Sequence, residues 1–309
     1  MLLASLWGAS YLFIKVALED LSPAMIVLLR TALAALVLVP LAASRRGLRT
    51  LRGGARVVLA VATVQVAAPF LLISAGEQEI SSSLTGILVA SSPLFIALLA
   101  VWLDQEERSS GWGLVGVVAG FVGVAVLIGV NLVGDLGALL GAAAVLLASL
   151  GYAVGGFIVK RSSAKLDPLG LAAGSMVVAT VLVAPIAIPS APTELPSAAT
   201  LGSIAILGLG GTGVAFALFH TLIAHDGPAR AMLVSYIAPA FAVLYGATLL
   251  GESVTVATVV GLILIVGGSW LGAGRGTRPR PAEDDADDRP GRPGVERARR
   301  APELAGRAA

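Results

Sequence analysis

Long apolar segments, separated by short charged loops, run through most of this chain and limit the folds open to it. Hydrophobic residues make up 57% of the 309 residues and charged residues only 13%, whereas a soluble domain carries about 25% charged residues. A chain so poor in charge cannot present a polar surface to water on all sides. Apolar runs of about 18 residues or more are typical of transmembrane helices. We therefore expect an all-α integral membrane protein.

Ten such segments can be marked along the chain. Backbone groups in lipid must satisfy their own hydrogen bonds, so each segment should be a helix. The predicted spans are Leu2–Leu18, Pro23–Ala43, Val57–Ala75, Ser83–Leu103, Gly111–Leu132, Leu136–Val159, Pro168–Ile188, Ala198–Ala224, Ala229–Leu250 and Val254–Leu271.

The chain also repeats itself at an offset of about 145 residues. The matched pairs are Lys15 and Lys160, Pro23 and Pro168, Pro40 and Pro185, Gly116 and Gly261, Gly123 and Gly268, Pro93 and Pro239, and Glu106 and Glu252. The predicted units are residues 1–132 and 136–273. Because each holds an odd number of spans, the second should lie upside down relative to the first. Inverted repeats are typical of secondary transporters, whose substrate site lies between the repeats near the bilayer midplane.

Lysine and arginine predict the orientation, because cytoplasmic loops carry an excess of both. Of the 21 Lys and Arg residues, all but Lys15 and Arg30 fall on one side if the N-terminus is inside. Trp102, Trp112 and Trp270 fall at the same interface, where tryptophan is enriched. The frequent use of Ala, Gly and Arg points to a bacterial source. We therefore expect a multi-pass protein of a bacterial inner membrane with both termini in the cytoplasm.

The two ends of the chain and its cysteine content complete this picture. Residues 274–309 are rich in Arg, Pro, Asp and Ala, and we expect a disordered cytoplasmic tail, because its apolar content is too low to form a core. No cleavable signal is expected. Met1 lies almost inside the first span, which suggests a shortened N-terminus. The chain has no cysteine, so disulfides and thiol chemistry are excluded.

Arg30 is a candidate functional residue, because a charged side chain inside a membrane is costly and needs a reason. It lies about seven residues into the second span, roughly 10 Å along the helix axis at 1.5 Å per residue. Two interpretations remain open. Its side chain either snorkels outward past Pro23, or faces the interior and attracts a carboxylate or phosphate.

Lys15 lies near the outer end of the first span. Trp7, Tyr11 and Lys15 recur every four residues and therefore share one helical face. Such a stripe would suit a ligand that is planar or bears a carboxylate. The alternative is an interfacial lysine accompanied by Glu19 or Asp20.

Uncharged polar residues within the spans are further candidates. His220 would relay a proton or hydrogen-bond a neighbouring helix. Gln65, Ser92, Ser235 and Tyr236 are more often helix–helix contacts than ligand contacts. Together they are candidates to line a cavity.

Prolines inside predicted spans mark candidate hinges, because a mid-helix proline removes one backbone hydrogen bond and bends the helix. Pro69, Pro93 and Pro239 are placed in this way. Pro93 and Pro239 occupy matched positions of the two units, and we expect them to be the hinges of the moving elements.

Other function classes find little support in the sequence. The carboxylates before the tail fall at span ends or in loops, so no deep carboxylate is expected to carry a coupling proton. Glu106 and Glu252 should meet the N-terminal ends of the spans that follow them. The glycine-rich run at 208–213 lacks the Lys-Ser/Thr ending of a phosphate loop. With no catalytic triad or metal cluster, we expect no enzyme activity, no metal or other cofactor, and no nucleic-acid partner.

The opening segment LWGASYLFIKVALEDLSPAMIVLLRTALAALVLVP resembles the start of an EamA-type domain. The residues that carry this resemblance are Trp7, Gly8, Lys15, Pro23 and Arg30. The ends of the two units resemble the same family. They contribute Pro93 and Glu106 in the first unit, and Pro239, Glu252, Gly261 and Gly268 in the second. The resemblance covers about residues 1–130 and 137–273.

This resemblance implies the drug/metabolite transporter superfamily, whose ten-span members have two inverted five-helix repeats and cytoplasmic termini. It also implies a central cavity lined by spans 1, 3, 4, 6, 8 and 9, alternating access, and often export of amino acids or related metabolites. The second unit departs from the pattern, because Ser175 replaces Arg30, and Tyr152 with Ala153 replaces the Trp-Gly pair. The first span lacks the glutamate of the small multidrug relatives, which disfavours cationic drugs.

We expect a secondary transporter that exports a small, polar, amino-acid-like metabolite. Lys15 and Arg30 would attract its anionic group, and Tyr11, His220 and Tyr236 would shape specificity. The alternative is a non-transporting membrane scaffold or receptor, which would need no polar cavity. The expected partners are the metabolite and the lipid bilayer, and a homodimer is left open.

Overall fold

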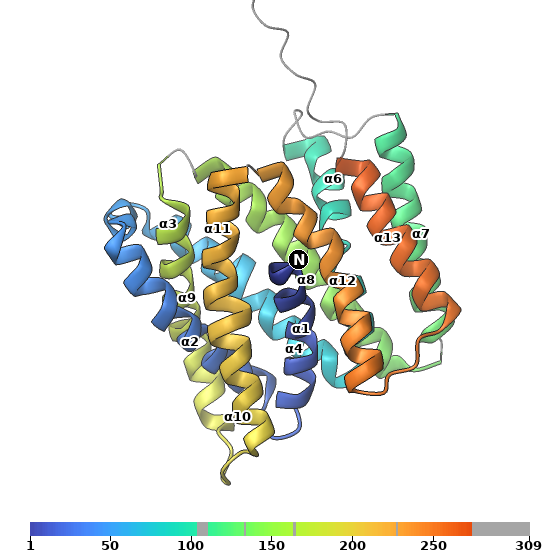
Figure 1. The fold of residues 1–309 in the computed structure, drawn as a ribbon, viewed down its shortest axis with the longest axis horizontal. Helices are drawn as coiled ribbons and strands as arrows, with labels where there is room; N and C mark the ends of the chain where they lie inside the picture. Colours follow the sequence, from blue (N-terminus) through green and yellow to red (C-terminus); the bar gives the residue numbers. More distant parts are fainter. Residues whose placement is uncertain (104–110, 133, 163–164, 227, 274–309) are drawn as a thin grey trace, which may run out of the picture. The chain divides into compact units, whose positions relative to one another are not determined.

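The computed structural model describes residues 1–103, 111–132, 134–162, 165–226 and 228–273, and Figure 1 shows their elements as a helical bundle. In chain order these elements are α1 (Leu2–Ala17), α2 (Pro23–Ser44), the 3₁₀ turn η1 (Gly47–Leu51), α3 (Ala55–Val61), the π-helical η2 (Ala62–Ala67), α4 (Ala68–Glu79), α5 (Ser82–Val89), α6 (Ser92–Leu103), α7 (Trp112–Asn131), α8 (Leu136–Ser162), α9 (Pro168–Ala187), the 3₁₀ turn η4 (Ile188–Ser190), α10 (Ala198–Ala205), the π-helical η5 (Ile206–Val214), α11 (Ala215–Asp226), α12 (Pro228–Leu249) and α13 (Val256–Ala273).

The predicted all-helical membrane protein is confirmed for the described residues. Seven helical runs are long and apolar enough to cross a membrane, and three shorter apolar helices accompany them at Leu2–Ala17, Leu233–Leu249 and Val256–Gly272. Every predicted span coincides with helical structure. The count of ten crossings stays a prediction, and the predicted tail at 274–309 lies outside the described residues.

Several helices begin where the sequence provides a cap. The side chains of Ser22, Ser81, Asp167 and Ser197 each accept a hydrogen bond from the backbone N–H three residues later. Such a bond satisfies one of the free N–H groups of the first helical turn. The α2 and α9 helices also begin with proline, whose missing N–H costs nothing at that position. Local sequence therefore fixes where these four helices start.

Packing pairs helices that are distant in the sequence. The α2 helix packs along α9, α7 along α13, α1 along α12, and α4 along α8, and Figure 1 shows α7 and α13 side by side. The largest buried cluster gathers residues of α1, α2, η2, α4, α9 and η5. This cluster surrounds the buried polar residues described below.

Two π-helical segments interrupt the helices at comparable places. The η2 segment lies between α3 and α4, and η5 lies between α10 and α11. A shift of 145 residues carries residues 62–67 onto 207–212, which lie inside η5. The glycine-rich run at 208–213 is therefore part of a helix rather than a phosphate loop. Short π segments are rare and frequently occur at functional sites. The interior beside η2 and η5 is therefore a candidate functional region.

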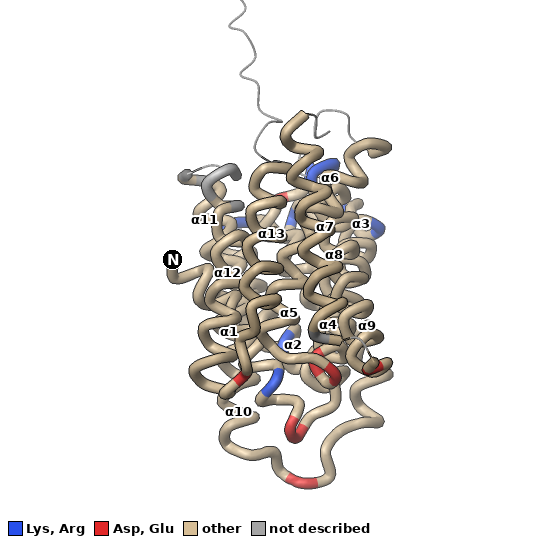
Figure 2. Tube along the Cα trace, turned by 90° about the vertical axis from the view of Figure 1, so that its right-hand side faces the viewer, with Lys and Arg blue, Asp and Glu red and all other residues tan. Residues whose placement is uncertain are grey.

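The outside of the bundle is apolar, as a lipid environment requires. Trp102, Trp112 and Trp270 are 73%, 64% and 59% exposed. Figure 2 shows most acidic segments at the lower end of the bundle and most basic segments toward the upper end. This separation of charge agrees with the asymmetry that the sequence predicts across the membrane.

Candidate substrate site

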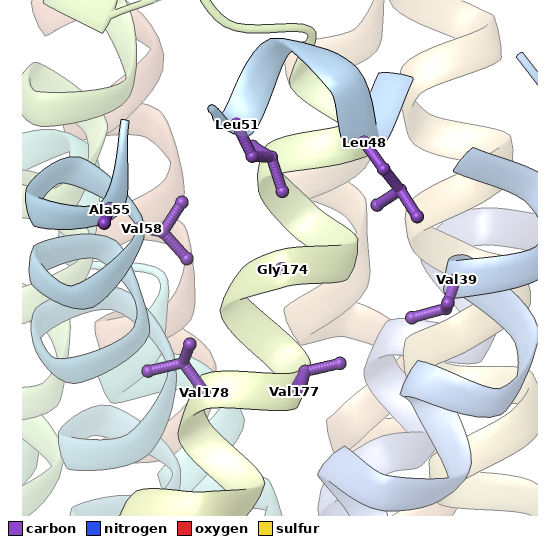
Figure 3. A pocket seen from close by; sticks show the side chains of 8 residues that line it. All are labelled: Val39, Leu48, Leu51, Ala55, Val58, Gly174, Val177 and Val178. Carbon is purple, nitrogen blue, oxygen red and sulfur yellow. The ribbon is translucent and has the colours of Figure 1, made fainter. Parts of the chain in front are cut away.

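A cavity of about 370 Å³ lies between α2, η1, α3 and α9 (Figure 3). The side chains that line it are all apolar: Val39, Leu48, Leu51, Ala55, Val58, Val177 and Val178, together with Gly174. None of them can donate or accept a hydrogen bond. The cavity therefore offers no recognition for a polar solute, and the polar interior of the bundle is the better candidate.

The polar interior contains Tyr11 on α1, Arg30 on α2, Glu77 on α4 and Tyr152 on α8. Arg30 and Glu77 are 7% and 0% exposed, and both tyrosines pack against the largest apolar cluster. Electrostatic interactions link Arg30 with each of the other three. These four helices come from both predicted units. This polar group, which we call the central cluster, is the candidate site.

Arg30 faces the interior, so the snorkelling interpretation is wrong. Its Nε–H donates to the hydroxyl of Thr212 on η5 at 2.8 Å, and its guanidinium lies 3.8 Å from the centre of the Phe70 ring. A cation over an aromatic face is attracted by the ring quadrupole. The Thr212 hydroxyl in turn donates to the carbonyl of Leu207. The guanidinium is thus held in place by groups from α4 and η5.

Lys15 does not pair with Glu19 or Asp20, which was the alternative interpretation. Its ammonium donates to the backbone carbonyls of Glu77 and Ile80, at the end of α4. The last carbonyls of a helix are unpaired and carry partial negative charge, which favours a cation there. Lys15 therefore joins α1 to the C-terminal end of α4.

Asp20 lies in the loop that follows α1 and has a different role from Lys15. Its carboxylate accepts hydrogen bonds from the hydroxyl of Thr200 at 2.7 Å and from the backbone N–H of Ser197 at 2.8 Å. These bonds hold the pKa of the Asp20 carboxyl below its usual value. Asp20 therefore ties the loop after α1 to the start of α10.

Glu77 lies near the end of its span, as expected for a carboxylate, but its complete burial was not expected. The α4 helix continues to Glu79, four residues past the predicted span end at Ala75. Glu77 is completely buried, and neither side-chain oxygen has a hydrogen-bond partner among the described residues. A signal was present in the sequence, because Ser81 is a helix cap and the preceding helix had no reason to end earlier.

Trp7 and His220 belong to an aromatic group on α1 and α11. The ring of Trp7 lies 5.1 Å from that of Phe219 and 6.3 Å from that of Phe216. His220 contacts the same two rings at 6.1 and 6.5 Å. The structure therefore brings Trp7 and His220 together through two phenylalanines that the sequence had not singled out.

Ser92 and Pro93 lie at a break between α5 and α6. The helix is interrupted at residues 90–91, and Pro93 cannot donate to the carbonyl of Val89. Hydroxyl groups satisfy the carbonyls at the break. Those of Ser91 and Ser149 donate to Leu88, that of Ser92 to Val89, and that of Ser269 to Ala90. Pro239, in contrast, lies inside the continuous α12 helix.

Gln65 and Tyr236 are the remaining candidates. Gln65 lies in η2 and packs against Gly155 of α8. Tyr236 lies on α12 and is partly buried. No hydrogen bond between either residue and the central cluster is found among the described residues.

Glu252 also departs from its expected place. Its carboxylate accepts hydrogen bonds from the backbone N–H groups of Ser82 and Ser83. These groups begin α5, not the span that follows Glu252. Its matched residue, Glu106, lies outside the described residues. The closing glutamate of the second unit therefore caps a helix of the first.

Comparisons with known proteins agree on the kind of protein. The sequence model of the EamA-like transporter family matches residues 1–129 and 139–272. An "Uncharacterized transporter" of Archaeoglobus fulgidus is 25% identical over 87% of this chain and 95% of its own length. The "Uncharacterized inner membrane transporter YedA" of Escherichia coli (strain K12) is 28% identical over 81% of each chain.

Two further comparisons concern function and fold. A protein of Escherichia coli (strain K12) named "Probable amino-acid metabolite efflux pump" is 26% identical over 88% of this chain and 92% of its own length. One crystal structure superposes with a TM-score of 0.66 at 21% identity, covering 88% of this chain and 96% of that chain. This last likeness shows a shared fold.

The apolar helices and the inner-membrane relatives together indicate a multi-pass protein of the inner membrane. The relatives are named as transporters rather than enzymes. The family model spans nearly the whole helical part of the sequence. The chain therefore belongs to the EamA-like transporter family.

Proposed function

We propose that this membrane transporter exports small polar metabolites such as amino acids by alternating access between two inverted five-helix repeats. The observation that carries the proposal is the central cluster, where a buried guanidinium and a buried carboxyl lie among tyrosines from both predicted units. A scaffold or receptor would need only apolar packing there. Buried charge at the interior of a membrane protein favours a solute pathway.

Glycine contacts support the inverted arrangement. The α7 and α13 helices approach closely at two places, where Gly116 meets Gly268 and Gly123 meets Gly261. The sequence repeat matches Gly116 with Gly261 and Gly123 with Gly268. Exchanging the two units therefore turns one contact into the other. A twofold relation between the units has this property.

The pairing of the longer helices is also unchanged when the two units are exchanged. The matched helices α2 and α9 pack on one another, as do α7 and α13. The π segments η2 and η5 each lie beside the opposite member of the α2 and α9 pair. The two segments of the family match also lie within the predicted units 1–132 and 136–273. These relations support a moving interface between two similar halves.

The charges of the site support a substrate with an anionic group. Arg30 presents a planar, permanently charged guanidinium, which matches a carboxylate well. Lys15 and Tyr11 lie on α1 and Tyr152 on α8, and electrostatic interactions link both tyrosines with Arg30. The relative named as an amino-acid metabolite efflux pump supports the same class of solute and the outward direction.

The remaining candidates take secondary places in this proposal. Trp7 and His220 would bound the site from the aromatic group on α1 and α11, and Gln65 and Tyr236 would line its approaches. Ser92 and Pro93 would act at the break between α5 and α6. Pro239 would act as the hinge of α12.

Flux in proteoliposomes tests this function. The full chain is reconstituted and loaded with a panel of labelled amino acids. We expect saturable efflux of at least one of them, with a KM that rises about tenfold or more in Arg30→Gln, because one desolvated charge-assisted contact is worth roughly 1.5–3 kcal/mol. The exposed Arg49→Gln in η1 serves as the control and should leave KM unchanged.

Two results would overturn the proposal in different parts. Folded protein without saturable flux of any amino acid would refute the substrate class. Saturable flux that Arg30→Gln does not alter would remove Arg30 from the site but leave transport in place.

A further inference from the structure

Glu77 is the acidic member of the central cluster, and it cannot attract an anionic substrate as Arg30 does. Its side chain is 0% exposed, and both carboxyl oxygens lack a hydrogen bond among the described residues. The hydroxyl of Ser74, one turn earlier on α4, is likewise buried and unpartnered. An ionised carboxylate is strongly disfavoured where neither water nor a donor compensates it. These surroundings suit a neutral carboxyl better than a carboxylate.

The charged groups that face Glu77 have hydrogen bonds to other groups. Lys15 on α1, Arg30 on α2 and Glu252 after α12 interact with Glu77 electrostatically. Glu77 also interacts electrostatically with Tyr11 on α1. The Lys15 ammonium is bound to backbone carbonyls. Arg30 is bound to Thr212, and the Glu252 carboxylate caps α5. No cation is hydrogen-bonded to the Glu77 side chain.

Lys15 is the cation whose hydrogen bonds place it at Glu77. The Lys15 ammonium donates to the backbone carbonyl of Glu77 itself, so it lies beside the residue whose carboxyl is free. Its second acceptor is the carbonyl of Ile80 at the end of α4. If α1 shifts along the end of α4, the ammonium leaves these carbonyls and reaches the carboxylate. An ammonium next to a carboxyl group favours the ionised form of that carboxyl.

We infer that Glu77 is the proton-exchanging group of the transport cycle and that Lys15 is its partner in the ionised state. When Glu77 is unpartnered, as in this structure, its carboxyl carries a proton. When the interior opens and Lys15 pairs with it, the O–H bond breaks and the proton passes to water on the open side. A proton returns when Lys15 goes back to the carbonyls of α4. This inference rests on the proposed transport function and names the proton as its coupling ion.

Infrared difference spectroscopy of the full chain tests the protonation without any substrate. A protonated carboxylic acid has a C=O stretch that its carboxylate lacks. We expect this band near neutral pH in the wild type and its loss in Glu77→Gln. The matched control is Glu79→Gln, two residues later on α4 and exposed, which should keep the band. A wild type without the band, or a band that survives in Glu77→Gln, would overturn the inference.

A second variant covers the case in which Glu77→Gln does not fold. Lys15→Gln removes the proposed ionic partner and leaves the acid in place. The band should then persist to higher pH than in the wild type, because no cation remains to stabilise the carboxylate. An unchanged titration of the band would refute Lys15 as the partner.

Transport measurements separate this inference from the proposed function. In proteoliposomes with an imposed pH gradient, the wild type should drive net movement of the labelled amino acids, and Glu77→Gln should not. The exposed control Glu79→Gln should respond to the gradient as the wild type does. Saturable flux that ignores the pH gradient would overturn the role of the proton while leaving amino-acid transport standing.

Discussion

The carboxylate of Glu252 accepts hydrogen bonds from both the backbone N–H and the hydroxyl of Ser83, which lies 169 positions earlier in the chain. The backbone N–H of Ser82 donates to the same carboxylate at 2.7 Å. A negative charge at a helix N-terminus satisfies free N–H groups and interacts favourably with the helix dipole. This contact fastens the loop after α12 to the start of α5, at one end of the predicted interface between the units.

Replacing Glu252 by glutamine should therefore destabilise the protein. The variant keeps the shape of the side chain but loses its charge and one strong acceptor. We expect a loss of about 1–2 kcal/mol in the free energy of unfolding, measured by denaturant unfolding in micelles with circular dichroism. Glu194→Gln, in an exposed loop, is the control and should change little. An equal effect of both variants would contradict the capping role.

Arg30 and Thr212 should be energetically coupled. The 2.8 Å bond between them is buried and joins α2 to η5, so the loss of either partner should remove much of what the other contributes. We expect a coupling free energy of about 0.5–3 kcal/mol in the double-mutant cycle of Arg30→Lys and Thr212→Val. Lysine keeps the charge but not the planar guanidinium that stacks on Phe70.

The control for this cycle is Thr63→Val in the other π segment, η2. The Thr63 hydroxyl is exposed and donates only to the Leu59 carbonyl of its own helix. Combining Thr63→Val with Arg30→Lys should give additive effects. Additive effects for Thr212→Val as well would show that the Arg30–Thr212 bond contributes no coupling in the folded protein.

Gly268 should not tolerate a side chain, whereas its neighbour should. A methyl group on Gly268 would collide with the backbone carbonyl of Gly116 on α7, and backbone cannot move aside as a flexible side chain can. We expect Gly268→Ala to cost about 1–3 kcal/mol of stability. Gly267→Ala, where an added methyl meets no atom within 4 Å, should be neutral or up to about 1 kcal/mol more stable, because alanine favours helix.

Thermal unfolding of these two glycine variants compares them directly. The same substitution is made one residue apart on α13, so the change in helix propensity is shared. A loss of stability in Gly267→Ala that equals the loss in Gly268→Ala would refute close packing of α7 against α13.

Asp20 should make part of the stability depend on pH. Its bonds to Thr200 and Ser197 depress the pKa of the carboxyl in the folded state, relative to about 3.9 in an unfolded chain. The contribution of these bonds is therefore complete above the unfolded pKa and is lost as the pH falls through the folded pKa. Asp20→Asn should lower the melting temperature at pH 7.

The pH profile of Asp20→Asn provides the check. The difference in melting temperature between wild type and variant should shrink as the solution becomes acidic. Glu19→Gln, the exposed neighbouring position, should follow the wild-type profile. A difference that stays constant down to strongly acidic pH would contradict an ionised Asp20 as the acceptor.

Most contacts of the site could not be predicted from the sequence, because they join helices that are far apart in the chain. The spacing of Trp7, Tyr11 and Lys15 placed them on one face of α1 but could not say what faces them. Trp7 meets Phe219, whereas Lys15 meets the end of α4. The position of Arg30 in α2 was equally compatible with the lipid boundary and with the interior.

The lengths of the apolar segments were enough to predict a bundle of apolar helices, because an isolated backbone segment in lipid satisfies its hydrogen bonds as a helix. Local sequence also predicts where several helices begin, since caps such as Ser22 and Ser81 act within three residues. The bond of Arg30 to Thr212, the capping of α5 by Glu252 and the burial of Glu77 appear only in the folded bundle. Each of these depends on which helices pack together, and that choice is made by contacts between residues far apart in the chain.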